Sequence, residues 1–199
     1  MTLLRSATLF TLAAAASVCL VAGCSEKNAG QPTPAPTTGG NSSETATSSS
    51  SAAPGLSFAK FIDKPCDVLT SAQITTLGTF KEAKPSTDST GPSCRWAATD
   101  PTKGISYTVS LLTDGTTIDK VTENVKTAPV YRKAEVSGLP AVSSDSTDGK
   151  GTCATAVGAS SKDTFLVQIS TLNESTPEYK DSCGATEKVA ALVIQNLKG

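Results

Sequence analysis

Histidine is absent from the 199 residues of this sequence. It is the commonest general base, the commonest metal ligand and the only side chain that ordinarily titrates near neutral pH. Its absence excludes Ser-His-Asp and Cys-His nucleophiles. Aromatic residues are also scarce at 5%, and Trp96 is the only tryptophan.

Net charge is nearly absent as well, with a formal value of −1 at pH 7. Apart from the pair Arg132-Lys133, no block of like charge occurs, and the lysines are scattered along the chain. Binding to nucleic acid requires clustered lysine and arginine side chains that neutralise phosphates. We therefore expect no nucleic-acid partner.

The N-terminal segment has a single charged side chain, Arg5, followed by an uncharged run rich in alanine and leucine up to Gly23. A short basic start, an apolar centre and small residues at the end are typical of a signal peptide. The ending Val21-Ala22-Gly23-Cys24 resembles the lipobox of bacterial lipoproteins. We predict cleavage before Cys24, attachment of lipid to Cys24, and anchoring to the extracytoplasmic face of the cell membrane.

The alternative for this segment is an uncleaved transmembrane helix, because the uncharged run is just long enough to span a bilayer. Alanine, serine, threonine and glycine make up more than half of it, however, and these residues insert weakly. No basic cluster follows it. These features favour the signal peptide.

Between Ser25 and Gly55 the sequence lacks valine, isoleucine, leucine, methionine and aromatic residues. Such a segment cannot bury enough apolar surface to offset the entropy of ordering, so we expect a disordered tether. The predicted organisation is a signal peptide over 1–23, the lipidated cysteine with its tether over 24–55, and one globular domain over 56–199.

Processing would leave four of the six cysteines in the domain: Cys66, Cys94, Cys153 and Cys183. An even number in an exported chain predicts two disulfides. No C-x-x-C pair occurs, which disfavours a metal site. Of the three connectivities, we favour Cys66–Cys94 with Cys153–Cys183, because each bond would join a cysteine at a helix start to one on a nearby strand.

Hydrophobic periodicity predicts an α+β fold, in which an antiparallel sheet of about five to six strands packs against two or three helices. A Thr70-x-x-Gln73 capping box starts the first helix and Gly78 ends it. Strands are expected over 93–98, 105–112, 152–157 and 164–170, together with a strand that runs into a turn over 135–140. Further helices are expected over 118–125 and 185–197.

Several of these segments together resemble a family of uncharacterised actinobacterial lipoproteins. The resemblance depends on Pro65-Cys66-Asp67-Val68-Leu69-Thr70, Cys94-Arg95-Trp96, Gly138-Leu139-Pro140, Cys153, and Cys183 before an amphipathic helix. It implies secretion and two disulfides. It implies no activity and supplies no catalytic residues.

Candidate catalytic motifs are weak. Ser57-Phe58-Ala59-Lys60 matches the Ser-x-x-Lys of penicillin-recognising enzymes, but it adjoins the tether and its companion motifs are missing. The loop Asp145–Gly151 lacks the acid spacing of a calcium site and is interpreted as a polar turn. Arg95 is expected on the sheet surface, and Trp96 in the core beside a disulfide.

The function predicted from these observations is a non-enzymatic envelope lipoprotein. The membrane is its partner through the lipid on Cys24, its domain binds an envelope protein or a small ligand, and it needs no cofactor. Two alternatives remain open. The domain carries lipid or another small ligand in an apolar pocket, or it hydrolyses cell-wall material through paired carboxylates.

Overall fold

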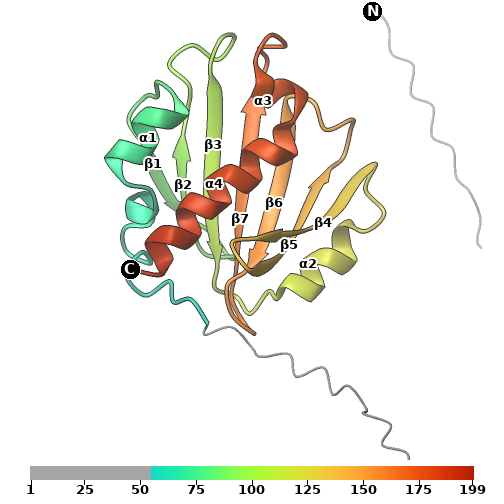
Figure 1. Ribbon diagram of the computed structural model, residues 1–199. Coiled ribbons are helices and arrows are strands. Elements are labelled where there is room, and N and C mark those ends of the chain that lie inside the picture. The colour runs from blue at the N-terminus through green and yellow to red at the C-terminus, as the bar shows by residue number, and fades with distance from the viewer. Residues whose placement is uncertain (1–54) are drawn as a thin grey trace, which may run out of the picture. The chain divides into compact units, whose positions relative to one another are not determined.

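The computed structural model describes residues 55–199, which form a seven-stranded antiparallel sheet covered by helices (Figure 1). The strand order is β1-β2-β3-β7-β6-β5-β4. The strands are β1 Lys84–Thr87, β2 Pro92–Trp96, β3 Ile105–Leu112, β4 Val130–Val136, β5 Leu139–Asp145, β6 Thr152–Gly158 and β7 Thr164–Thr171. The predicted α+β class is therefore confirmed.

The helices are the 3-10 helix η1 Pro65–Val68, α1 Ser71–Leu77, α2 Ile118–Val125, the short α3 Pro177–Lys180 and the long α4 Ser182–Leu197. The predicted capping box is present at α1: Gln73 N–H donates to Thr70 Oγ1 at 3.3 Å, and Thr70 N–H donates to Gln73 Oε1 at 2.8 Å. Gly78, with a φ of 146°, ends this helix. No helix in the described part of the chain is long and apolar enough to cross a membrane.

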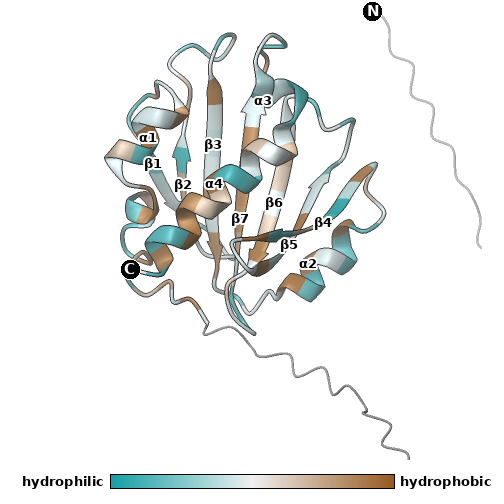
Figure 2. Cartoon of the chain, viewed as in Figure 1, coloured by the Kyte–Doolittle hydropathy of each residue, from teal (hydrophilic) through white to brown (hydrophobic). Residues whose placement is uncertain are grey.

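One sheet face packs against α4, which crosses the strands obliquely in Figure 1. Alternate residues of β3, β6 and β7 point toward this helix, and Figure 2 shows apolar segments of these strands behind it. The helix contributes a fully buried stripe that includes Val189, Ala190 and Val193. Burial of this apolar surface is the main stabilising contribution to the fold.

The opposite sheet face is largely uncovered, and we call it the open face. Because Thr155 bonds to α4 and side chains alternate along a strand, its neighbours Ala154 and Ala156 point to the open face. There α2 covers only the region of β5 and β6. Gly158 at the end of β6 lies so close to α2 that a side chain at this position would contact Ile118. The outward residues of the inner strands include Ser93, Arg95, Ser106, Thr108, Ser110, Ser144, Thr152, Ala154, Leu166, Gln168 and Ser170. The register of the edge strands β1 and β4 places Lys84, Tyr131, Lys133 and Glu135 on the same side.

Two disulfides connect the helical layer to the sheet. Cys66 in η1 is bonded to Cys94 in β2, and the two Cα atoms are 4.9 Å apart. Cys153 in β6 is bonded to Cys183 in α4, with 5.1 Å between the Cα atoms. These are the two pairings that the sequence favoured, and each joins the start of a helical segment to a strand. Trp96, 2% exposed, lies in the core as expected.

The prediction of a strand that runs into a turn over 135–140 is confirmed for the end of β4 and its turn, but it missed the strand that follows the turn. A two-residue turn, Ser137-Gly138, separates β4 from β5, so Leu139 begins a new strand rather than ending one. Both turn residues have positive φ, 52° for Ser137 and 85° for Gly138. Such a turn suits the right-handed twist of a hairpin. The sheet also gains the edge strand β1, and it has seven strands rather than five or six.

The predicted signal peptide (1–23), Cys24 and the tether up to residue 54 lie outside the described residues.

Candidate functional site

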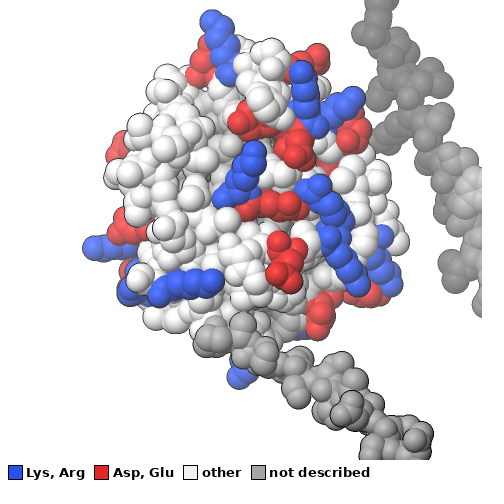
Figure 3. Space-filling model, viewed as in Figure 1, with Lys and Arg blue, Asp and Glu red and all other residues white. Residues whose placement is uncertain are grey.

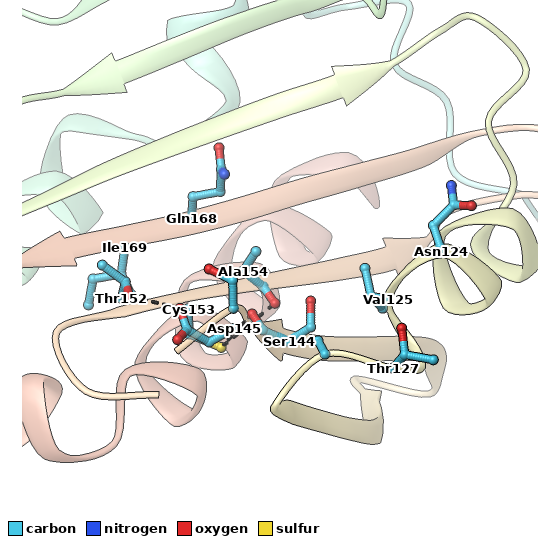
Figure 4. A pocket seen from close by; sticks show the side chains of 12 residues that line it. Asn124, Val125, Thr127, Ser144, Asp145, Thr152, Cys153, Ala154, Gln168 and Ile169 are labelled. Atoms are coloured by element: carbon cyan, nitrogen blue, oxygen red, sulfur yellow. Dashed lines mark hydrogen bonds between the residues drawn. The ribbon is translucent and has the colours of Figure 1, made fainter. Parts of the chain in front are cut away.

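A groove with a volume of ≈ 470 Å³ lies on the open face, beside the C-terminal end of α2 (Figure 4). Strands β5, β6 and β7 form its floor, which includes Ser144, Ala154 and Gln168. Asn124 and Thr127 form the wall on the α2 side. The floor is low because Ala154 is small, and the antiparallel register places it between Ser144 and Gln168. Side chains from separate parts of the chain thus meet at one hollow.

The polar side chains of this groove have unused hydrogen-bonding capacity. Among the described residues, no protein partner is found for the side chains of Asn124, Thr127, Ser144 or Gln168. Each amide offers donors and an acceptor, and each hydroxyl offers a donor and an acceptor. The groove is therefore able to donate and accept hydrogen bonds with a bound molecule without breaking bonds of its own.

Asp145, the one ionisable residue that lines the groove, is already used by its own loop. Its Oδ1 accepts hydrogen bonds from the backbone and hydroxyl of Thr147 and from Gly149 N–H, and its Oδ2 accepts one from the Thr152 hydroxyl at 2.7 Å. Burial raises the pKa of Asp145, but the bonds from Thr147, Thr152 and Gly149 outweigh it and hold the pKa below its usual value. The loop is the polar turn that the sequence indicated.

The same Asp-x-Thr turn occurs at three other loops, where Asp88, Asp100 and Asp114 each accept a backbone hydrogen bond from the threonine two residues later. In each case the hydroxyl of that threonine, followed by its backbone N–H, lowers the pKa of the aspartate. This repeated pattern of a short acceptor side chain closing its own turn is a sequence signal that identifies Asp145 as structural.

The open face carries little charge in its centre. The outward positions of β3, β7 and β6 hold serine, threonine, glutamine, alanine and leucine, with no ionisable side chain among them. Arg95 on β2 is exposed there, as the strand alternation predicted. The α4 side differs, because lysine and arginine alternate with acidic residues over the surface seen in Figure 3.

A chain of buried hydroxyl groups runs under α4, on the other face of the sheet. Thr186 and Thr155 approach within 2.6 Å, and Thr155 and Ser143 within 2.8 Å. The Ser143 hydroxyl donates to Glu187 Oε1 at 2.8 Å, and Arg132 Nη2 donates to the same oxygen at 2.7 Å. The three hydroxyl residues are fully buried. They align α4 on β5 and β6 rather than meet a substrate.

A second recess, with a volume of ≈ 460 Å³, lies between α1 and the segment that follows it. Ile74, Phe80, Ala83 and Trp96 give it an apolar lining, and Lys81 is its one charged residue. The indole Nε1–H of Trp96 is buried and has no partner among the described residues. A buried donor without a partner is uncommon in native structures.

The remaining sequence candidates within residues 55–199 take part in turns and disulfides. Ser57 is exposed, and its hydroxyl accepts a hydrogen bond from Ala59 N–H at 3.2 Å, so it closes a turn. No group of three or more cysteine, aspartate or glutamate side chains within residues 55–199 is placed to hold a metal ion. Cys66, Cys94, Cys153 and Cys183 are all consumed by disulfides.

Sequence reasoning did not find the groove. Its residues belong to no motif, and they are brought together only by the strand register and by the position of α2. The one available signal was the row of serine and threonine at alternate positions of 105–112, which marks an outward face without showing where it is hollow.

Fold and disulfides define this domain as a small disulfide-bonded α+β module with an open polar sheet face. Residues 19–196 match the family described as protein of unknown function (DUF3558). The match covers nearly the whole chain, and the protein belongs to this family. Searches of curated proteins and of solved structures gave no significant match.

Proposed function

We propose that this protein is a cell-envelope lipoprotein, anchored to the membrane through lipid on Cys24, whose domain binds a ligand or partner without catalysing a reaction. The observation that carries the binding role is the groove on the open face. Four of its polar side chains, those of Asn124, Thr127, Ser144 and Gln168, have no partner among the described residues, and they converge from the region of α2 and from β5 and β7.

The anchor is supported by the lipobox-like Val21-Ala22-Gly23-Cys24 and by the two disulfides. Disulfides form and persist mainly in oxidising compartments outside the cytoplasm. The described chain begins beside the β6–β7 turn, where Leu56 N–H donates to Ala159 O at 2.8 Å. The groove lies at the opposite end of β6, beside Thr152 and Ala154.

A binding role is favoured over catalysis by the chemistry of the groove. Ser144 and Thr127 have no neighbouring general base in the lining, because the chain has no histidine and the Asp145 carboxylate is occupied by its own loop. General acid–base catalysis requires a titratable group within hydrogen-bond reach of the reacting atom. The groove instead offers neutral donors and acceptors.

The test places a photo-crosslinking amino acid at Gln168 in the membrane-anchored protein in living cells. Lys188, exposed on α4 at the other side of the sheet, is the matched control position. A crosslinked species of fixed added mass at position 168, and none at position 188, supports the proposal. No adduct at position 168, or the same adduct at both positions, refutes it.

A second candidate function is supported by the recess at Trp96. Its apolar lining and its one charged residue, Lys81, suit a small amphiphile with an anionic head group, so the domain would act as a carrier. Since Trp96 is the only tryptophan, its fluorescence reports directly on occupancy. A saturable change on titration with decanoate supports carriage, and an unchanged spectrum counts against it.

A further inference from the structure

We infer that the groove and the adjoining open face bind a neutral carbohydrate chain. This inference rests on the proposed binding role of the groove and specifies the chemical class of its ligand. It follows from the charge, the hydrogen-bonding groups and the apolar content of the surface.

Charge excludes the common ionic ligands from the groove. No lysine or arginine lines it, so phosphate groups, nucleic acid and acidic headgroups have no counter-charge there. The single carboxylate, Asp145, already accepts hydrogen bonds on both oxygens from its own loop. One half-buried carboxylate among neutral amides and hydroxyls gives the groove little charge, and a neutral ligand requires none.

The hydrogen-bonding groups match a polyhydroxylated ligand. Asn124 and Gln168 present amides, and Thr127 and Ser144 present hydroxyls, so donors and acceptors are interspersed over a small area. Sugar hydroxyls are likewise both donors and acceptors. The groove volume of ≈ 470 Å³ lies within the usual range for small-molecule sites.

Composition argues against a protein partner at this surface. Protein interfaces are enriched in tyrosine, tryptophan, phenylalanine, methionine and arginine. None of these residues lines the groove. The aliphatic side chains of Val125, Ala128 and Ala154 are too few to hold an acyl chain, but they suit the apolar C–H edges of a sugar ring.

The sheet register extends the groove into a track across the strands. Thr108, Gln168, Ala154 and Ser144 are successive cross-strand partners on β3, β7, β6 and β5. Neighbouring strands are about 4.8 Å apart, which is close to the length of one sugar unit in an extended glycan. A chain lying across the strands would therefore meet one polar side chain for nearly every sugar.

The experiment is an NMR titration of the full chain carrying Cys24→Ala, with four neutral probes: maltohexaose, cellohexaose, mannohexaose and hexa-N-acetylchitohexaose. We expect at least one of them, at about 5 mM, to shift the amide signals of Ala154 and Gln168 in a saturable way. Dextran sulfate serves as the anionic comparison and should leave these signals unchanged.

Substitutions test whether the saccharide binds in the groove. The double variant Ser144→Ala/Gln168→Ala removes two hydrogen-bonding side chains and should weaken binding by about tenfold or more. Lys188→Ala, on the opposite side of the sheet, should leave the affinity unchanged. The spectrum of each free variant establishes that it is folded, so that a lost affinity reports on the groove.

Each other outcome overturns the inference. The inference is refuted if none of the four hexasaccharides shifts the amide signals, or if the shifts are confined to the α4 side. It is also refuted if dextran sulfate binds more tightly than the hexasaccharides, or if the double variant keeps full affinity. Failure here is separable from failure of the proposed function. If a crosslinker at Gln168 still captures a polypeptide, the binding role stands and the carbohydrate assignment falls; if it captures nothing, both fall.

Discussion

Removal of the Cys153–Cys183 disulfide, by Cys153→Ala together with Cys183→Ala, should destabilise the domain strongly. The bond closes a sequence separation of 30 residues and joins β6 to α4. In the chain-entropy model, a loop of this length contributes ~3.6 kcal/mol by restricting the unfolded chain. Cys66–Cys94, with a separation of 28 residues, should contribute about the same.

The two contributions should add. The loops 66–94 and 153–183 do not overlap in sequence, so each bond restricts a different part of the unfolded chain. Removing both should cost ~7 kcal/mol. Domains of this kind have total stabilities of about 5–15 kcal/mol. Either single-bond variant should therefore remain folded, whereas loss of both should leave the domain at or beyond the limit of folding.

Urea unfolding measures these costs, followed by the fluorescence of the buried Trp96 and by far-ultraviolet circular dichroism. Circular dichroism is the check on the Cys66–Cys94 variant, because Trp96 is two residues from Cys94 and its emission can change locally. A loss below about 1 kcal/mol for either bond, or a double loss far from the sum, would refute the entropic reasoning.

Three further predictions concern the loops and the layer under α4. The pKa of Asp145 is lowered in the folded state, so its contribution to stability is present above about pH 4 and is lost as the pH falls through the folded-state value. Asp145→Asn should therefore lower the urea midpoint at about pH 7 and make the midpoint depend less on pH in the acid range. An unchanged pH profile would contradict this. Gly138 has a φ of 85°. Gly138→Ala should therefore cost about 1 kcal/mol in thermal unfolding; a neutral effect would remove the strain argument. In Thr155→Val, Ser143 and Thr186 both lose a buried partner. This variant should cost about 1–3 kcal/mol; a more stable variant would show that the hydroxyl chain does not support the fold.

Much of the fold could be predicted because several segments carry strong local signals. The alternation over Ile105–Leu112 reproduces β3 residue for residue, and the Thr70/Gln73 capping box with Gly78 marks both ends of α1. The predicted processing would leave four of the six cysteines, and their positions near helix starts and strands favoured the observed pairing.

The missed elements lacked such signals. Every residue of β1 is exposed and Pro85 lies within it, so no apolar alternation marks this strand. The hairpin of β4 and β5 turns at Ser137-Gly138, where the serine adopts a positive φ. Glycine, asparagine or aspartate at this position would have indicated a two-residue hairpin turn in the sequence. Pro140 follows two residues later, and because proline is typical of turns, the sequence indicated a continued turn there rather than the start of β5.

The groove could not be predicted because it depends on relations between distant segments. Asn124 and Gln168 are far apart in sequence, and they meet only because α2 packs on the open side of β5 and β6. Local patterning shows that 106, 108 and 110 face outward, but the hollow beside them follows from the small Ala154 and from the strand order β7-β6-β5.

The lipid anchor is the claim on which the location of the protein depends, and one measurement tests it directly. Cells grown with a radioactive fatty acid should yield labelled protein whose N-terminal peptide begins at an acylated Cys24, and Cys24→Ala should abolish the label and release the domain from the membrane. Unlabelled native protein, or a mature N-terminus at any other residue, would contradict the account.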